Sequence, residues 1–307
     1  MSNEFKVDPK DATKEFPRVP IAWSWNLRPL LAEASDVDGV GSDDERETAR
    51  ERWLKQGTGT LAHPLTGHNL VLQYARNTEP VMTTICGPGG YDTWQHGEPS
   101  TDGRGRGLYM GAEIIFHEPM PGTAFGEIRH RLDGIYGVKG SAFVRHVGEL
   151  WSEDGATHYQ DVQIMCRVAG MAPDGVERPP KSPVEVPDRE PDAVCAHQLA
   201  GKRLVFRWAC ASEDPNLRHI DESDPRAHGP CAISIVTHDI LREFAGDDVS
   251  RLRGLRVPAF LRPFYQEDDL EVSLWKIDET TVVARLIRPR IEGADRHVFD
   301  LEARLVD

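Results

Sequence analysis

The chain has 307 residues, enough for one large domain or two of ordinary size, and its 39% hydrophobic and 28% charged residues are typical of a soluble globular protein. A formal net charge of −14 argues against nucleic-acid binding, which normally needs a basic face. No apolar run is long enough to span a membrane.

The sequence of the first half predicts one long helix followed by several strands. Its N-terminus is polar and has no signal-peptide core, so we expect a cytoplasmic protein. Residues 33–52 are acidic, and a short surface helix is expected over 43–53. Apolar residues at helical spacing predict a helix over 64–78. Strand-like segments follow at 108–118, 123–134, 139–151 and 156–169.

A Pro-rich stretch at residues 172–193 divides the chain. It carries six prolines separated by charged residues, a composition that supports neither a helix nor a central strand. We predict an extended linker that contributes little to the core. The linker would separate a module over 1–171 from a second one over 194–307.

The second half repeats the order of the first. Apolar residues at helical spacing between 232 and 244 predict a long helix that ends at Gly246. Strand-like segments follow at 254–262, 269–277, 280–288 and 296–306. Residues 116–119 parallel 260–263, and 153–156 parallel 291–294, which indicates a weak internal repeat. A single module of this kind leaves a sheet edge to cover, so we predict two modules paired side by side.

The segment over 212–229 is the densest cluster of candidate catalytic residues. It contains Asp214, Asn216, His219 and Asp221, and His228 with Gly229 then opens the long helix. A carboxylate and an imidazole five residues apart can serve as a general acid/base pair if both face one dry pocket. Asp, Asn and Pro also dominate turns, so the spacing alone equally allows a turn that caps the helix.

Residues 214–221 read Asp-Pro-Asn-Leu-Arg-His-Ile-Asp and resemble the Asp-x-Asn-x-x-His-x-Asp motif of the MaoC-like (R)-specific enoyl-CoA hydratases, with the following His-Gly in the expected place. Residues 257–264 resemble the family strand that ends in Arg-Phe-x-x-Pro. The resemblance implies an α+β fold of the double hot-dog type. Each module would wrap a curved antiparallel sheet around a long helix. The first module, divergent and without its own catalytic pair, would form the acyl pocket.

The resemblance also implies the chemistry, which is reversible hydration of a trans-2-enoyl thioester to an (R)-3-hydroxyacyl thioester. Asp214 and His219 would hold the water and divide the acid and base roles, in an order that the sequence leaves open. The amide of Gly229 would donate to the thioester oxygen, where a side chain would block close approach. Asn216, Asp221 and His228 would support the loop and the helix start.

One departure from the family leaves an alternative open. Only Glu222–Ala227 separate the motif from His-Gly, so the segment that overhangs the family's active site is shortened, and Arg218 and Arg226 lie nearby. The chain could therefore be a silent hot-dog protein that binds an acyl thioester or supports a partner subunit. A hot-dog thioesterase is disfavoured by the Asp-to-His spacing. His63 and His68 have no carboxylate at matching spacing and are not expected to be catalytic.

No cofactor motif stands out. The chain has no G-x-G-x-x-G, P-loop or H-E-x-x-H pattern, and its five scattered cysteines indicate reduced thiols rather than a zinc site. We therefore expect no metal and no cofactor beyond the CoA or carrier protein that holds the substrate. The expected partner is an acyl thioester, with neither nucleic acid nor membrane, and the oligomeric state stays open, a homodimer being one option.

Overall fold

The computed structural model describes residues 7–23, 61–77, 81, 84–85, 107–170, 172–201, 203–212, 219 and 226–306. Its first half begins with a 3-10 helix, η1 (Pro9–Thr13), and strand β1 (Val19–Trp23). Helix α3 (Thr66–Asn77) and four strands follow: β2 (Gly107–Phe116), β3 (Ala124–Val138), β4 (Ser141–Ser152) and β5 (His158–Val168). These elements confirm the predicted helix and strands, while the helix predicted over 43–53 lies outside the described residues.

The second half contains strand β6 (Ala193–Gln198), helix α6 (Leu204–Ala211) and the long helix α7 (Gly229–Phe244). The 3-10 helix η3 (Val249–Arg251) precedes the strands β7 (Leu252–Val257), β8 (Asp269–Lys276) and β9 (Thr281–Ile287). A second one, η4 (Gly293–Arg296), precedes β10 (His297–Leu305). The predicted helix and four strands are confirmed, although β7 ends five residues early, just before Pro258. A proline has no N–H for the ladder, so it suits the end of a strand.

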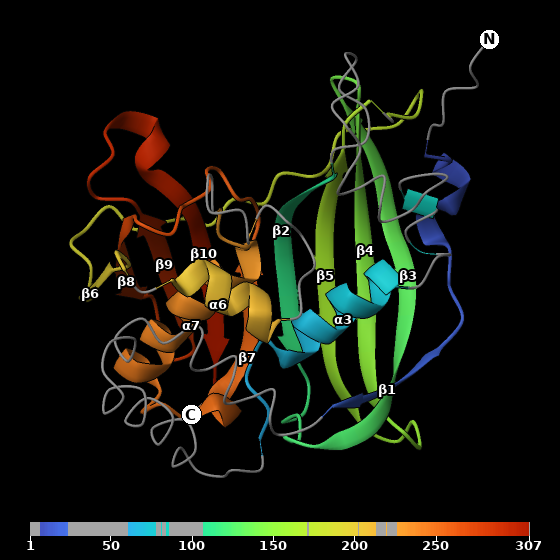
Figure 1. Cartoon of the computed structure of the whole chain (residues 1–307), viewed down its shortest axis with the longest axis horizontal. Coiled ribbons are helices and arrows are strands. Elements are labelled where there is room, and N and C mark those ends of the chain that lie inside the picture. Colours follow the sequence, from blue (N-terminus) through green and yellow to red (C-terminus); the bar gives the residue numbers. More distant parts are fainter. Residues whose placement is uncertain are drawn as a thin grey trace.

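All ten strands join one sheet in the order β1-β3-β4-β5-β2-β7-β10-β9-β8-β6, as Figure 1 shows. Each half arranges its four strands alike, as β2-β5-β4-β3 and as β7-β10-β9-β8. The halves meet where β2 and β7 pair antiparallel, from Ala112 opposite Val257 to Ile115 opposite Gly254. This arrangement confirms the predicted double hot-dog fold.

Gly111 lets the two halves approach each other at the start of this pairing. A Cβ atom there would lie 2.7 Å from the carbonyl oxygen of Val257 and 2.8 Å from that of Pro258. Neither backbone atom can move aside cheaply, so the join requires a glycine at this position.

The main hydrophobic core is shared between the halves. It includes Ile114 and Ile164 of the first sheet half, Val236 of α7, and Leu255 and Leu301 of the second sheet half. Helix α7 is buried along most of its length. No helix in the described ranges is long and apolar enough to cross a membrane.

The Pro-rich segment behaves differently from the expectation that it would add little to the core. Residues 172–192 form neither helix nor strand where they are described, but Val184 is buried against Trp275 and Val283 in a small separate cluster. The indole of Trp275 donates to the carbonyl oxygen of Arg189 at 2.9 Å. The Pro-rich segment therefore packs on the second half through apolar contacts that its proline content did not predict. The module boundaries drawn at this segment stay a prediction.

A protease site inserted after Gly175, where a Cβ atom would have no other atom within 4 Å, should give a nicked chain that stays associated. We expect this because the β2–β7 ladder and the shared core hold the halves together after the linker is cut. Gel filtration before and after cleavage shows whether the two halves still elute together.

The matched experiment expresses residues 194–307 alone, which should be poorly soluble or self-associate because β7 then becomes an open edge. A soluble, monomeric and cooperatively unfolding 194–307 fragment would contradict the dependence of each half on the other.

Two histidines are buried between the sheet and helix α3 in the first half. His130 of β3 and His146 of β4 are each 2% exposed, and their Nδ1 and Nε2 atoms lie 2.9 Å apart. One ring must donate and the other accept, so at least one is neutral. Burial lowers the pKa of His130 from 6.5 to about 4. Burial and the neighbouring His130 also lower the pKa of His146.

This pair should make the fold sensitive to acid. Below pH 6.5 the unfolded chain takes up protons on histidines that the folded chain keeps neutral, so stability is complete above pH 6.5 and is lost as the pH falls toward 4. Each histidine can contribute up to about 1.4 kcal/mol per pH unit in that window. Urea unfolding at pH 7, 6 and 5 should show a shallower loss in H130Q/H146Q than in the unmodified chain. Equal slopes would contradict the assignment.

Candidate active site

A cavity of about 510 Å³ lies where the two halves meet. The first half lines it with residues of α3, β2, β4 and β5, and the second half with α6, the start of α7 and residues 260–264. Most of the lining side chains are apolar, among them Leu72, Met110, Ile164, Trp208 and Phe260. Such a cavity suits an apolar ligand with a few polar groups.

A β-bulge in β2 places consecutive residues on the cavity wall. The pairing of β2 with β5 shifts register between Tyr109 and Gly111, so Met110 is the extra residue. Leu108, Tyr109 and Met110 all line the cavity, where regular alternation would present every second side chain.

The start of helix α7 forms a further part of the cavity wall. His228 is the N-cap residue, Gly229 begins the helix, Pro230 lies in its first turn, and all three line the cavity. The first N–H groups of a helix have no partner within it, and that end of the helix carries a partial positive charge. This wall can therefore donate hydrogen bonds to an anionic or polarised oxygen.

His219 lies on the same wall. Its Nδ1 is 2.6 Å from the carbonyl oxygen of Arg226, which can only accept, so Nδ1 carries the proton and Nε2 has the lone pair in the neutral ring. The ring stacks on His228, with centroids 3.3 Å apart and planes at 29°. His228 itself is buried at the helix start, where its ring packs against that of His219.

The structure thus brings together His219, His228 and Gly229 of the predicted site residues. Asp214, Asn216 and Asp221 lie outside the described residues, so their positions and roles stay predictions. Of the two cations expected nearby, Arg226 lines the cavity, and Arg218 is also outside the described residues.

Tyr109 is a site residue that the sequence did not reveal. Its hydroxyl lies 2.8 Å from Nε2 of His68, and its ring packs 5.2 Å from that of Phe260. A Cβ atom on Gly229 would lie only 2.8 Å from the Tyr109 ring and 3.0 Å from Phe260. A side chain at Gly229 would therefore meet these rings first. Burial raises the pKa of Tyr109, so its hydroxyl stays protonated.

Cations from both halves reach the cavity. Arg167 of β5 and Arg226 and Arg262 of the second half line it. Arg262 is held by Asp295 at 2.5 Å, and Arg226 lies over the Tyr265 ring at 5.9 Å. These guanidinium groups suit a ligand with an anionic portion.

Comparisons with known proteins agree with the motif. No protein-family model matches the chain. A probable enoyl-CoA hydratase 2 from Dictyostelium discoideum is 29% identical over 126 residues, which are 38% of this chain and 42% of that protein. Peroxisomal multifunctional enzyme type 2 from Mus musculus is 33% identical over 102 residues, 31% of this chain and 14% of the enzyme. The matches thus span less than half the length of either relative.

Solved structures share the fold over nearly the whole chain. A MaoC-like dehydratase from Phytophthora capsici superposes with a TM-score of 0.70 at 17% identity and covers 98% of both chains. Full-length peroxisomal multifunctional enzyme type 2 from Drosophila melanogaster gives 0.69 at 17% identity over 94% of this chain and 48% of its own. A Mycobacterium tuberculosis protein with a double hot-dog fold gives 0.55 at 12% identity, covering 96% of each chain. The structural matches establish the fold, and the sequence matches support the resemblance to the MaoC-like hydratase family.

Replacing Gly229 with alanine should strain the contact between the halves. G229A forces the new methyl group against the Tyr109 ring and should cost about 1–3 kcal/mol of unfolding free energy. Most of that cost should disappear in a Y109A background, because the ring is gone, and should persist in Y109F, which keeps the ring. Denaturant unfolding of the double-mutant cycles measures the coupling. An equal cost in all three backgrounds would contradict the contact.

Proposed function

We propose that this relative of the MaoC-like hydratases is a hydro-lyase that reversibly adds water to a trans-2-enoyl thioester and yields an (R)-3-hydroxyacyl thioester. The observation that carries the proposal is that His219, from the hydratase-like motif, and the first turn of α7 share one wall of a mainly apolar cavity. The relatives named enoyl-CoA hydratase 2 and peroxisomal multifunctional enzyme type 2 support it.

Hydration needs a base for the water and an acid for the substrate carbon. Attack of water at C3 releases a proton to the base, and C2 receives a proton from the acid as the double bond is lost. His219, with its lone pair on Nε2, can take either role, and Asp214 of the same motif would take the other. The backbone contact at Nδ1 fixes the ring's tautomer and orientation, which acid/base transfer requires.

Negative charge develops on the thioester oxygen between the two proton transfers. The amide of Gly229 at the start of α7 would donate to that oxygen, supported by the positive end of the helix. The space that a side chain at Gly229 would need is filled by the Tyr109 and Phe260 rings, so a glycine lets the start of α7 lie against these rings beside the cavity.

The remainder of the cavity would bind the acyl chain. Its apolar walls come from both halves, with Leu72, Met110 and Ile164 from the first and Trp208 and Phe260 from the second, so the first module would form only part of the pocket. Arg167, Arg226 and Arg262 would favour an anionic group on the acyl chain, CoA or carrier protein. A cytoplasmic location, a homodimer and hydration without a further catalytic cofactor belong to the same proposal.

Substituting the acid/base pair should abolish turnover without unfolding the chain. D214N and H219A should each lower kcat by about 10²–10⁴-fold, the usual effect of losing a general acid or base. The assay follows loss of the enoyl absorbance of crotonyl-CoA and of longer enoyl-CoA substrates. Thermal unfolding should stay close to that of the unmodified chain.

The matched control is D221N, which neutralises another aspartate of the same motif. It should keep most of the activity because Asp221 is expected to support the loop rather than to transfer a proton. Near-full activity in both D214N and H219A would contradict the site assignment. Tight binding of enoyl-CoA by an inactive unmodified chain would favour the alternative, a silent acyl-thioester-binding protein.

A further inference from the structure

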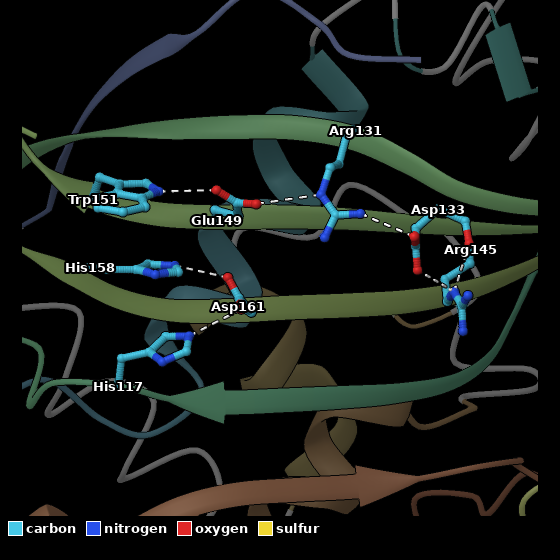
Figure 2. Close-up of polar contacts among 8 residues, drawn as sticks. All are labelled: His117, Arg131, Asp133, Arg145, Glu149, Trp151, His158 and Asp161. Atoms are coloured by element: carbon cyan, nitrogen blue, oxygen red, sulfur yellow. Dashed lines mark hydrogen bonds and ion pairs between the residues drawn. The ribbon is translucent and has the colours of Figure 1, made fainter. Parts of the chain in front are cut away.

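A second cluster of titratable side chains lies on the outer face of the first half's sheet, opposite helix α3. His117 directly follows β2. His158 is the first residue of β5, and Asp161 lies three residues further along the same strand. The carboxylate of Asp161 reaches both rings, with Oδ2 3.0 Å from Nε2 of His117 and Oδ1 2.8 Å from Nε2 of His158 (Figure 2). Potential ligand atoms of the three residues all lie within 4.8 Å of one another.

These donors match a divalent transition metal. Imidazole nitrogen and carboxylate oxygen bind Zn²⁺ at about 2.0–2.2 Å, so two donors on one ion lie roughly 3–3.5 Å apart. The observed separations need only a small opening to admit the ion. Two histidines and a carboxylate also leave a coordination position for water.

The surrounding rings hold the two histidines in place. His158 is stacked between the ring of Trp151, with centroids 4.1 Å apart and planes at 5°, and the ring of His117, also at 4.1 Å. The guanidinium of Arg129 covers the Trp151 ring at 4.2 Å. A site whose ligands are already oriented loses less entropy when it binds an ion.

The charged residues next to Asp161 pair with one another, and Asp161 pairs with the two histidines. Glu149 lies directly across from Asp161 on β4, but its oxygens contact Trp151 Nε1 at 3.2 Å and Arg131 Nε at 3.4 Å. Arg131 also pairs with Asp133 at 3.2 Å, and Figure 2 shows this chain of contacts running away from the cluster. The ion pairs described for Asp161 are with His117 and His158.

The second half provides an internal comparison. Strand β10 also begins with a histidine followed three residues later by an aspartate, and His297 Nε2 lies 2.9 Å from Asp300 Oδ1. There the cross-strand residue is Arg285, which binds Asp300 at 2.8 Å. The fold is therefore the same, but the aspartate is neutralised by a cation.

The position of His117 also differs between the halves. The amide of His117 donates to the carbonyl oxygen of Tyr159 at 2.9 Å, and the amide of Leu261 donates to that of Val298 at 2.8 Å. Leu261 is thus the counterpart of His117, so the first half alone has a second imidazole at this corner.

From this contrast we propose that His117, His158 and Asp161 form a binding site for a divalent transition-metal ion, with Zn²⁺ as the best match. The ion would tie the end of β2 to the start of β5. Ile164, which lines the cavity, lies three residues from Asp161 along β5, so the two side chains point to opposite faces of the sheet. The site is therefore structural and takes no part in the hydration proposed above.

Calorimetric titration of the metal-free full chain with Zn²⁺ tests the proposal. We expect one ion at this site, weaker binding at acidic pH because the ligands must lose their protons, and a higher unfolding temperature with Zn²⁺. H117A and D161N should each weaken binding at least about tenfold, since loss of even an outer-shell partner typically costs 10–100-fold. Both should keep enoyl-CoA hydration.

H297A is the matched control because it removes the histidine of the equivalent pair, and it should bind Zn²⁺ as the unmodified chain does. A Co²⁺ spectrum without thiolate charge-transfer bands would exclude binding through Cys210, the exposed cysteine among those described. Absence of Zn²⁺ binding, unchanged affinity in H117A and D161N, or an equal loss in H297A would each overturn the proposal.

Discussion

The backbone ladder between β2 and β7 is the interaction on which the remainder of the structure depends. Each four-stranded half would otherwise end in a row of unpaired N–H and C=O groups, and the antiparallel pairing satisfies both rows at once. The same pairing brings Tyr109 of the first half against Gly229 of the second, and the amide of Phe260 donates to Met110 at 2.8 Å. The cavity exists only because this pairing holds the halves in register.

The two halves share one architecture and carry different side chains at equivalent places. The second half opens its long helix with His228 and Gly229 on the cavity, whereas the first half contributes walls and the buried His130–His146 pair. The corner that holds His117 in one half holds Leu261 in the other. Duplication of a module therefore preserves backbone hydrogen bonds while the side chains diverge, since the ladder constrains only the main chain.

Periodicity predicted most of the fold, because most of the long strands alternate buried and partly exposed residues, and α3 and α7 carry apolar residues at helical spacing. It missed the edge strands β1 and β6, which have only five and six residues, and α6, whose N-cap residue Arg203 is left-handed and gives no side-chain cap. The sequence motif predicted His219 and Gly229 as site residues because they lie only ten residues apart in the chain. Tyr109 and Arg167 reach the cavity through strand register, which a single sequence does not encode locally.

The bulge at Met110 makes the shape of the cavity depend on how many residues β2 contains as well as on which ones. In a regular strand, neighbouring side chains face opposite sides, so deleting one residue between 108 and 111 would restore alternation and turn one of the three wall residues away. A change in length would therefore remove a residue from this wall, whereas substitution changes the chemistry of the wall and keeps all three residues on it. The wall can vary in chemistry while the spacing of the chain through it stays constant.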